Sequence, residues 1–361
     1  MNHEKYIQRC LQIAKNGIGT TMPNPSVGAV VVLNDEIIGE GFTSPYGNSH
    51  AEVNAINTVK DKSQLTEATI YVTLEPCSHF GKTPPCADLI AKHQIKKVVI
   101  GCVDSNSLVT GKGIERLKNA GCTVIVGVLE KECRAHHKRF FTVQEEKRPF
   151  IILKWAETNN RFIAPLTKEE AKPVWISNTY SQQLVHKWRS EEHAILVGTN
   201  TVISDNPKLN IRSWKGNNPI RIVLDRTLRV PKDAHVFDGS VKTIVLTNIR
   251  IKSQESRQLS KMYATSSGVE KSQLVFEQVD FSENLAQQIC QVLQKHQIQS
   301  VIIEGGLQIL QTFIDAGLWD EARVFIGGNE FEDGVGAPVI SGKTIEEFKI
   351  KNDRLKIMAN D

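Results

Sequence analysis

Three potential metal ligands, at positions 50, 77 and 86, constrain this chain more than any other feature. His50 offers an imidazole, and Cys77 and Cys86 offer thiols. A catalytic zinc ion uses three protein ligands and keeps a fourth position open for water, so the fold has to bring these side chains to one point. In open α/β sheets, ligands gather at strand ends and helix starts. We therefore expect His50 and Cys77 to lie at helix starts that follow loops, with Cys86 in the same crevice.

A carboxylate lies close to the first of these ligands. Glu52 follows His50 by two positions and would point to a different side of a helix that begins at His50. Because catalytic zinc activates a water, Glu52 is the candidate for moving its proton rather than a fourth ligand. Isolated cysteine pairs are often just buried small apolar residues. The full pattern, His-x-Glu followed by Pro-Cys and a second Cys, is that of zinc deaminases of nucleobases, and it favours a catalytic zinc over a structural one or none.

The bulk properties indicate a two-domain enzyme. With 361 residues, the chain exceeds the size at which single cores stop growing. A hydrophobic content of 40% and a charged content of 23% are ordinary for a globular protein. The net charge of +4 comes without basic runs, which suits small anionic substrates and argues against nucleic acid. No apolar stretch has the length of a membrane span, and the start carries no secretory signal. The seven cysteines are an odd number, which favours reduced thiols in the cytoplasm.

Helix and strand signals alternate along the first part of the chain. From apolar runs and helical spacing, strands are expected over 27–33, 69–74, 97–101 and 122–128, and helices over 50–59, 87–93 and 114–120. Gly121 would follow the last of these helices at the position where helix-ending glycines belong. Repeated strand–helix units predict a layered α/β domain.

A charged break over 145–149 comes before a fresh apolar strand at 150–155, and we place the domain boundary there. The expected domains are 1–146 and 149–361. Further strands are expected over 194–198, 220–224, 243–247 and 300–303, and polar, aperiodic surface structure over 253–268.

A strand that leads into Gly305, Gly306 and a helix over 307–316 would let backbone N–H groups approach a phosphate, although a tight structural turn explains it equally well.

Several strings closely resemble those of the bifunctional riboflavin-biosynthesis deaminase/reductase family, over essentially the full length. These strings are NPSVG (24–28), HAE (50–52), TLEPCSH (73–79), GKTPPC (81–86) and GKG (111–113). The resemblance implies an α/β architecture, with an N-terminal cytidine-deaminase-like three-layer domain followed by a dihydrofolate-reductase-like domain that uses NADPH. It also implies that His50, Cys77 and Cys86 bind Zn²⁺ and that Glu52 shuttles protons.

The segment between the two cysteines contains His79 and Lys82, whose positive charge suggests an anionic group on the substrate such as phosphate. Taken alone, each would more often be a solvated surface residue. The resemblance implies that both, together with Asn24, hold a pyrimidine and its ribosyl phosphate.

In the second half, the resemblance assigns two sets of residues. Those expected along the dinucleotide are Ala156, Trp175, Thr201, Asp205, Thr247, Gly305, Gly306 and Leu307. Those expected to face the substrate and its phosphate are Lys154, Arg189, Leu209, Arg212 and Glu304. Lys154 and Asp205 are the candidates for proton handling or positioning, and arginine suits phosphate because its planar fork binds it through two bonds. Judged singly, Trp175 would be a core residue and the two arginines surface charges.

The chain departs from the family pattern at four places. Thr43 replaces a His, and the tripeptide 104–106 reads Asp-Ser-Asn instead of Asp-Pro-Asn, both on the substrate side of the first site. Pro173 stands where a Ser would offer a hydroxyl, and Arg161 replaces the Gly of a turn, which removes a residue that tolerates positive φ.

The function implied is a two-step one. The first step is zinc-dependent deamination of 2,5-diamino-6-ribosylamino-4(3H)-pyrimidinone 5′-phosphate, and the second is NADPH-dependent reduction of the ribosyl to the ribityl side chain. We expect a cytoplasmic homo-oligomer acting on a phosphorylated pyrimidine, with no nucleic acid and no membrane.

Two alternatives compete with this interpretation. One is a deaminase of another nucleoside or RNA base with a non-reductase binding module, but RNA binding predicts basic stripes interleaved with aromatics, which the second half lacks. The other is a non-catalytic protein that zinc stabilises and whose C-terminal domain merely binds a nucleotide, but a structural zinc has no use for a proton shuttle such as Glu52.

Overall fold

The computed structural model describes residues 2–80, 84–106, 109–168, 170, 172–250 and 273–360. The chain divides into two compact units, Met1–Lys147 and Arg148–Asp361. Among the described residues each hydrophobic cluster lies wholly within one unit, so each unit is described by itself. No helix in these ranges combines the length and apolarity needed to cross a membrane.

The first unit is built on a five-stranded sheet with the order β2-β1-β3-β4-β5. Its strands are β1 (Gly28–Leu33), β2 (Glu36–Phe42), β3 (Thr69–Leu74), β4 (Lys97–Cys102) and β5 (Thr123–Val126). Strand β1 runs antiparallel to both neighbours, whereas β3, β4 and β5 are parallel. The carboxyl ends of β3 and β4 therefore meet at one edge, which is where the first site forms.

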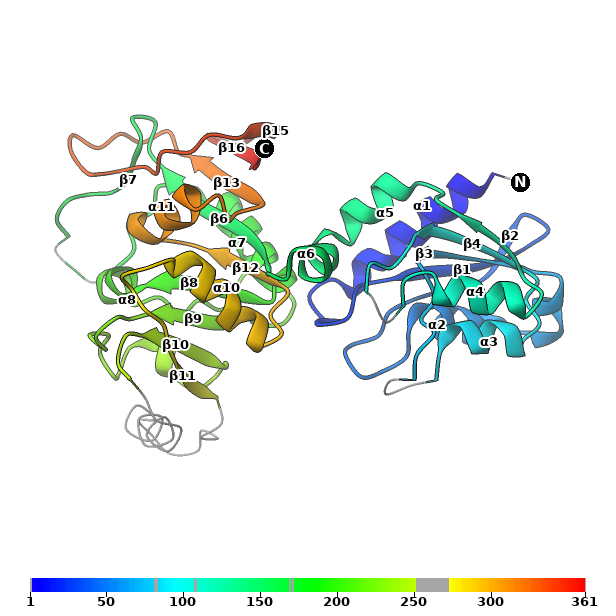
Figure 1. Cartoon of the computed structure of the whole chain (residues 1–361). Helices are drawn as coiled ribbons and strands as arrows, with labels where there is room; N and C mark the ends of the chain where they lie inside the picture. Colours follow the sequence, from blue (N-terminus) through cyan, green and yellow to red (C-terminus); the bar gives the residue numbers. More distant parts are fainter. Residues whose placement is uncertain are drawn as a thin grey trace. The chain divides into compact units, whose positions relative to one another are not determined.

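Helices cover both faces of this sheet and complete three layers (Figure 1). They are α1 (His3–Ala14), α2 (Ala51–Thr58), α3 (Cys86–Lys92), α4 (Lys112–Asn119), α5 (Glu130–His136) and α6 (Lys138–Glu146), with 3₁₀ turns at Lys15–Gly17 and Lys62–Thr66. Helices α1 and α5 lie on one face and α2, α3 and α4 on the other (Figure 1). Close approach of α1 depends on Gly28, since a Cβ there would lie 2.0 Å from the Cys10 carbonyl oxygen.

Most expected elements of this unit are present, with two corrections. The strand at 69–74 has the expected bounds, and Gly121 follows α4 with a φ of +86° as expected for a helix-ending glycine. Cys77 does not begin a helix: it lies in the loop after β3, and Cys86 is the first residue of α3 instead. Strand β2 was not expected, because its exposed half and two glycines weaken the apolar pattern.

The second unit contains a nine-stranded sheet with the order β11-β10-β9-β8-β12-β6-β13-β16-β15. Its strands are β6 (Phe150–Glu157), β8 (Ala194–Gly198), β9 (Ile220–Leu224), β10 (Thr243–Thr247), β11 (Leu274–Gln278), β12 (Ser300–Ile303), β13 (Glu321–Ile326), β15 (Lys343–Ile350) and β16 (Asp353–Ala359); β7 (Phe162–Ala164) pairs separately with β14 (Val335–Gly336). Strands β11 to β13 in this order are parallel, and β16 and β15 form an antiparallel edge.

The helices of this unit are α7 (Thr179–Glu191), α8 (Thr199–Asp205), α10 (Leu285–Lys295) and α11 (Leu307–Asp315), with a 3₁₀ turn at His235–Phe237. Both faces of the sheet are buried. Alternate residues of β6 show this, since Ile151 and Leu153 pack with α10 and α11, whereas Phe150 and Ile152 pack with α7. Strands buried on both faces read as continuous apolar runs, which is why β8, β9, β10 and β12 have the bounds expected from the sequence. The segment 253–268 lies outside the described residues.

Candidate active sites

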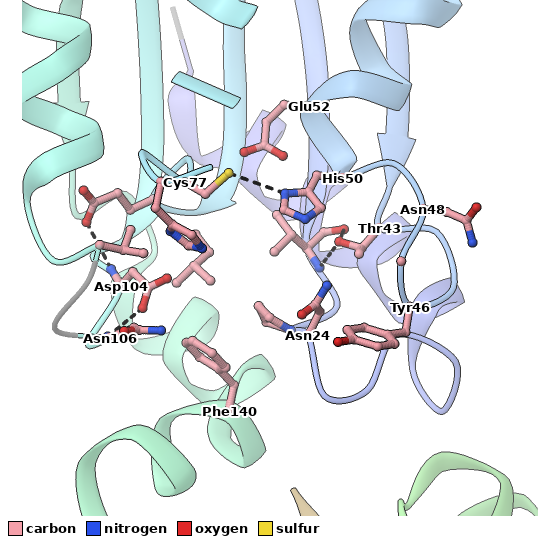
Figure 2. Close-up of a pocket in the computed structure, with 17 residues that line it drawn as sticks. Asn24, Thr43, Tyr46, Asn48, His50, Glu52, Cys77, Asp104, Asn106 and Phe140 are labelled. Carbon is pink, nitrogen blue, oxygen red and sulfur yellow. Dashed lines mark hydrogen bonds between the residues drawn. The ribbon is translucent and has the colours of Figure 1, made fainter. Parts of the chain in front are cut away.

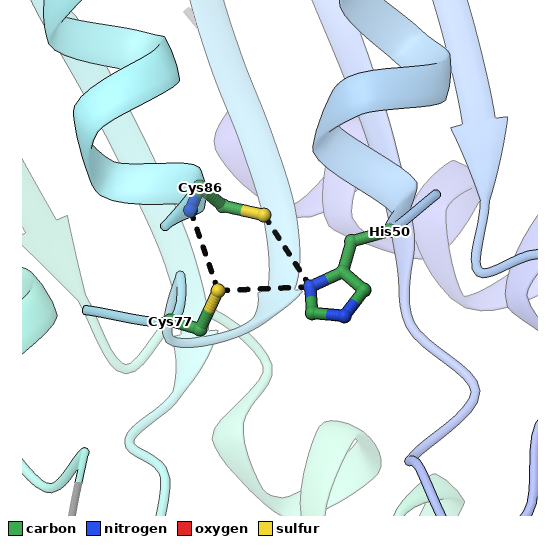
Figure 3. Close-up of side chains that lie close together, drawn as sticks. All are labelled: His50, Cys77 and Cys86. Carbon is green, nitrogen blue, oxygen red and sulfur yellow. Dashed lines mark hydrogen bonds between the residues drawn. The ribbon is translucent and has the colours of Figure 1, made fainter. Parts of the chain in front are cut away.

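The three expected metal ligands converge in the first unit (Figure 3). His50 precedes the first turn of α2 as its N-cap residue, and Cys77 and Cys86 come from the loop after β3 and the start of α3. Their ligand atoms all lie within 4.8 Å of one another. The Nδ1 atom of His50 is 3.6 Å from the Cys77 sulfur and 3.4 Å from the Cys86 sulfur. One imidazole and two thiols at these distances fit a zinc ion with an open fourth position.

The surroundings of Cys77 favour the thiolate that a metal requires. The backbone N–H of Cys86 donates to the Cys77 sulfur over 3.3 Å. The Cys86 thiol and the His50 imidazole lower the pKa of the Cys77 thiol, although burial opposes this. A thiolate is the form of cysteine that binds metal.

Glu52 lies outside the ligand group but in the same cavity. It is the second residue of α2 and is only 4% exposed. Burial raises the pKa of its carboxyl to about 7, and a carboxyl with such a pKa can both take up and release a proton near neutral pH.

A cavity of about 360 Å³ is lined by Glu52 and by two of the ligand residues, His50 and Cys77. Of the substrate-facing residues expected here, Asn24 and His79 line it and Lys82 lies outside the described residues. Residues that the sequence analysis missed also line it, namely Tyr46, Asn48, Glu75, Val109 and Phe140. Asn24, Tyr46 and Phe140 lie on the side of the cavity away from Glu52 (Figure 2).

Of the two departures from the family pattern in this unit, Thr43 lies in the cavity wall, and Ser105 lies between the wall residues Asp104 and Asn106. The hydroxyl of Thr43 is engaged with the backbone, because it accepts a hydrogen bond of 3.0 Å from the Val27 N–H. Asp104 is buried, and burial raises the pKa of its carboxyl to about 6. The same carboxylate accepts a 2.7 Å bond from the Asn106 N–H, which shapes this part of the wall.

A second cavity, of about 410 Å³, lies in the second unit at the carboxyl ends of β6, β8 and β12. Eight of the expected residues line it: Lys154, Trp175, Arg189, Thr201, Asp205, Leu209, Arg212 and Glu304. Five others do not, namely Ala156, Thr247, Gly305, Gly306 and Leu307. Thr247 is fully buried, and its hydroxyl donates to the Arg226 carbonyl over 2.9 Å. Trp175 is 56% exposed and is thus not the core residue considered as an alternative.

Three charged side chains form a network in this cavity. Arg189 donates to both carboxylate oxygens of Glu304, over 2.9 and 2.6 Å, and the Lys154 Nζ atom is 3.9 Å from Glu304 Oε2. Burial opposes ionisation of Glu304, but these two cations lower the pKa of its carboxyl to about 2. Arg189 is therefore an internal ion-pair partner and not an isolated surface charge.

Two groups at this cavity were not expected from the sequence, namely Lys168, which pairs with the cavity residue Asp205, and His186. Asp205 forms an ion pair with Lys168, and both side chains are mostly buried. His186 is 6% exposed, and burial together with the charges of Arg189 and Arg212 lowers the pKa of its imidazole to about 4. Burial is the main cause that keeps His186 neutral, and the positive charges of Arg189 and Arg212, which add to it, also favour an anionic ligand.

The glycine loop after β12 suits the approach of a dinucleotide phosphate. Gly305 has a φ of +126°, which favours glycine. Its carbonyl accepts a 3.0 Å bond from the N–H of Gly198 at the end of β8. Gly306 is the N-cap of α11 and provides no side-chain cap, so this helix start can face an anion.

The structure also places the two residues of the second unit that depart from the family pattern, Pro173 and Arg161. Pro173 lines the second cavity without a hydroxyl. Arg161 adopts a φ of +68° in the turn between β6 and β7, so the backbone keeps a left-handed conformation although glycine is absent. The Arg161 side chain donates to the Pro338 carbonyl over 3.0 Å.

Comparison with known proteins gives matches to both halves. Residues 1–102 match the cytidine and deoxycytidylate deaminase zinc-binding region, and residues 149–352 match the RibD C-terminal domain. The riboflavin biosynthesis protein RibD of Aquifex aeolicus is 38% identical over 99% of this chain and 96% of its own length. A diaminohydroxyphosphoribosylaminopyrimidine deaminase/5-amino-6-(5-phosphoribosylamino)uracil reductase from Thermotoga maritima has a similar structure, with a TM-score of 0.85 and 34% identity over 99% of each chain. A RibD structure from Acinetobacter baumannii matches with a TM-score of 0.87 and 30% identity, again over 99% of each chain.

The fold and the two cavities define a two-domain enzyme in which a cytidine-deaminase-like unit precedes a dihydrofolate-reductase-like unit. The chain belongs to the RibD family of riboflavin-biosynthesis proteins. It is accordingly a bifunctional enzyme, with a zinc-dependent deaminase half and an NADPH-dependent reductase half.

Proposed function

We propose that the enzyme acts on 2,5-diamino-6-ribosylamino-4(3H)-pyrimidinone 5′-phosphate in two consecutive steps. Residues 1–146 remove the exocyclic amine as ammonia, and residues 149–361 then reduce the ribosyl to the ribityl side chain. The observation that carries this proposal is the convergence of His50, Cys77 and Cys86 beside a cavity that Glu52 also lines.

In the first step, His50, Cys77 and Cys86 hold the zinc ion. When bound, the ion lowers the pKa of a water molecule toward neutrality. Glu52 takes the proton of the attacking water and delivers it to the departing ammonia, a task that suits a buried carboxyl with a pKa of about 7.

Substrate binding in the first cavity rests on polar side chains. Asn24 and His79 line the cavity and hold the pyrimidine. Lys82 contacts the ribosyl phosphate, since a cation suits that group.

In the second step, NADPH supplies the reducing equivalent. Residues proposed to line it are Ala156, Trp175, Thr201, Asp205, Thr247, Gly305, Gly306 and Leu307. Lys154 and Asp205 position the ribosyl group or move its proton, and Lys168 holds Asp205 in place. Leu209, Arg212, Arg189 and Glu304 face the substrate, with Arg212 directed to the phosphate.

We further propose a cytoplasmic homo-oligomer. All seven cysteines are free thiols, as expected in a reducing compartment. Strand β15 is an exposed sheet edge on which Ile345 is 50% and Phe348 42% exposed, and such edges pair with other chains. Light scattering on the purified protein tests the assembly, and a monomer would contradict it.

One assay tests the two-step proposal. Ammonia release and NADPH oxidation are measured together on the diaminopyrimidine phosphate, and we expect ammonia release to precede NADPH oxidation. Ammonia release without NADPH oxidation would show that Pro173 and the 158–161 turn disable the reductase half. No ammonia release from zinc-loaded enzyme would refute the assigned substrate.

A further inference from the structure

A buried glutamate organises the wall of the first cavity. Glu75 lies between the end of β3 and Cys77, lines the cavity and is 3% exposed. Its carboxylate accepts four backbone hydrogen bonds. Oε1 accepts from Gly113 (2.9 Å) and Ile114 (3.2 Å), and Oε2 accepts from Gly111 (3.0 Å) and Asp104 (3.3 Å).

Three of these bonds cap the start of helix α4, although Glu75 itself belongs to a different segment of the chain. The N-cap residue Gly111 has no side chain and a φ of +73°, so α4 has no cap of its own. Glu75, which precedes α4 by more than a full strand and helix, satisfies N–H groups that a local Ser or Asp would otherwise satisfy. Its negative charge also stabilises the positive end of this helix.

The capped helix is held directly against the segment that carries Cys77. A Cβ on Gly113 would lie 2.1 Å from the Pro76 carbonyl oxygen, so the first turn of α4 touches that backbone. One turn later, Arg116 donates to the Ser78 carbonyl over 2.7 Å and pairs with Asp88 in α3. Pro76 and Ser78 flank Cys77 on both sides, so α4 supports the ligand loop on either side of the sulfur.

The fourth bond extends this support to a neighbouring part of the cavity wall. By accepting from the Asp104 N–H, Glu75 connects the ligand loop to the segment that places Asp104 and Asn106 in the cavity. We propose that Glu75 is a positioning residue that holds the Asp104–Asn106 wall at its distance from the zinc ligands and thereby sets substrate affinity. This inference rests on the proposed deaminase function of the first unit.

The arrangement requires a carboxylate. All four partners are N–H donors, and only an ionised carboxylate offers two acceptor oxygens. In Glu75→Gln, an NH₂ group would face two donors, leaving two N–H groups without an acceptor. The variant keeps the size of the side chain and therefore isolates this effect.

The test compares Glu75→Gln with Glu115→Gln in the full-length, zinc-loaded enzyme. Glu115 is an exposed residue in the first turn of α4, so its variant also removes one carboxylate charge near the start of this helix but leaves the network intact. For Glu75→Gln we expect the KM of ammonia release to rise about tenfold or more, with kcat within a few-fold and zinc content unchanged. NADPH oxidation on the deaminated product serves as an internal control and should stay the same.

A second measurement does not depend on activity. Hydrogen exchange should accelerate in Glu75→Gln at one of the two amide pairs that share a carboxylate oxygen, Gly113 with Ile114 or Gly111 with Asp104, and should remain slow in Glu115→Gln. Unchanged exchange, an unchanged KM, a fall in kcat alone or a loss of zinc would each overturn the inference. If wild-type enzyme releases no ammonia from the diaminopyrimidine phosphate, the proposed function fails, whereas the exchange data still decide the role of Glu75.

Discussion

Two glutamates show how surroundings set the properties of a residue. Burial raises the pKa of Glu52 to about 7. Glu304 is largely enclosed as well, with 9% of its side chain exposed, yet Arg189 and Lys154 lower its pKa to about 2. The same side chain is thus suited to move protons in one cavity and to remain a permanent anion in the other.

Replacing Glu52 by Gln removes the group that moves the proton. We expect ammonia release to fall by roughly 10²- to 10⁴-fold, the usual contribution of a general acid–base residue. Zinc content should remain that of the wild type, because Glu52 is not in the ligand group. Metal analysis and an ammonia assay measure both, with Glu67→Gln as the exposed control. Loss of zinc together with folding would favour the structural-zinc alternative.

The Glu304 network should make stability depend on pH. Because the folded pKa of Glu304 is lowered to about 2, its stabilising effect is present above the unfolded pKa near 4.5 and is lost as the pH falls from there toward 2. At pH 6 the free energy of unfolding of the wild type should exceed that of Glu304→Gln by on the order of 1 to 3 kcal/mol, and this difference should shrink toward pH 3. All five tryptophans lie after residue 148, so urea unfolding followed by tryptophan fluorescence reports the second unit. A difference that stays constant with pH would refute this account.

Among the connections between elements, the turn between β6 and β7 is strained, because Arg161, a residue with a side chain, adopts a left-handed backbone conformation there. Arg161 has a φ of +68°, and its side chain compensates in part through the bond to the Pro338 carbonyl. Arg161→Ala loses that bond and keeps the backbone strain. Arg161→Gly also loses the bond, but it relieves the backbone strain. We therefore expect the Gly variant to be more stable than the Ala variant by about 1 kcal/mol. Urea unfolding by tryptophan fluorescence checks this, and an Ala variant as stable as Gly would contradict it.

At the scale of the whole molecule, the two units have separate cores and separate chemistry. Among the described residues, the ligand group lies entirely in the first unit, and none of the hydrophobic clusters joins the two units. The unit with the second cavity therefore has a fold that does not rely on the metal.

Removal of the metal should thus affect one activity only. After treatment with a chelator, ammonia release should fall below detection and return on addition of Zn²⁺. NADPH oxidation on the deaminated product should stay within about twofold, because the second cavity has its own supporting core. A parallel loss of both activities would show that the units depend on each other.

Much of the fold and site could be predicted from the sequence, because the signals are local. The apolar runs of β8, β9, β10 and β12 are buried on both faces and stand out without any knowledge of their neighbours. Strand β2 was missed because its exposed half and glycines give no such run. The placement of Cys77 at a helix start was wrong because the helix begins only after the intervening prolines, at Cys86.

The class of chemistry can be predicted from short segments, since the ligand residues, a nearby carboxylate and the family strings are all local. Which groups face one another depends on how the strands are ordered in space. Strand β12 lies between β8 and β6, which brings Glu304 to Arg189 and Lys154. Likewise, Glu75 reaches the start of α4 only because β3 and β4 are neighbours. Charges and hydrogen bonds act over a few ångströms of space, and strand order rather than distance along the chain sets those contacts.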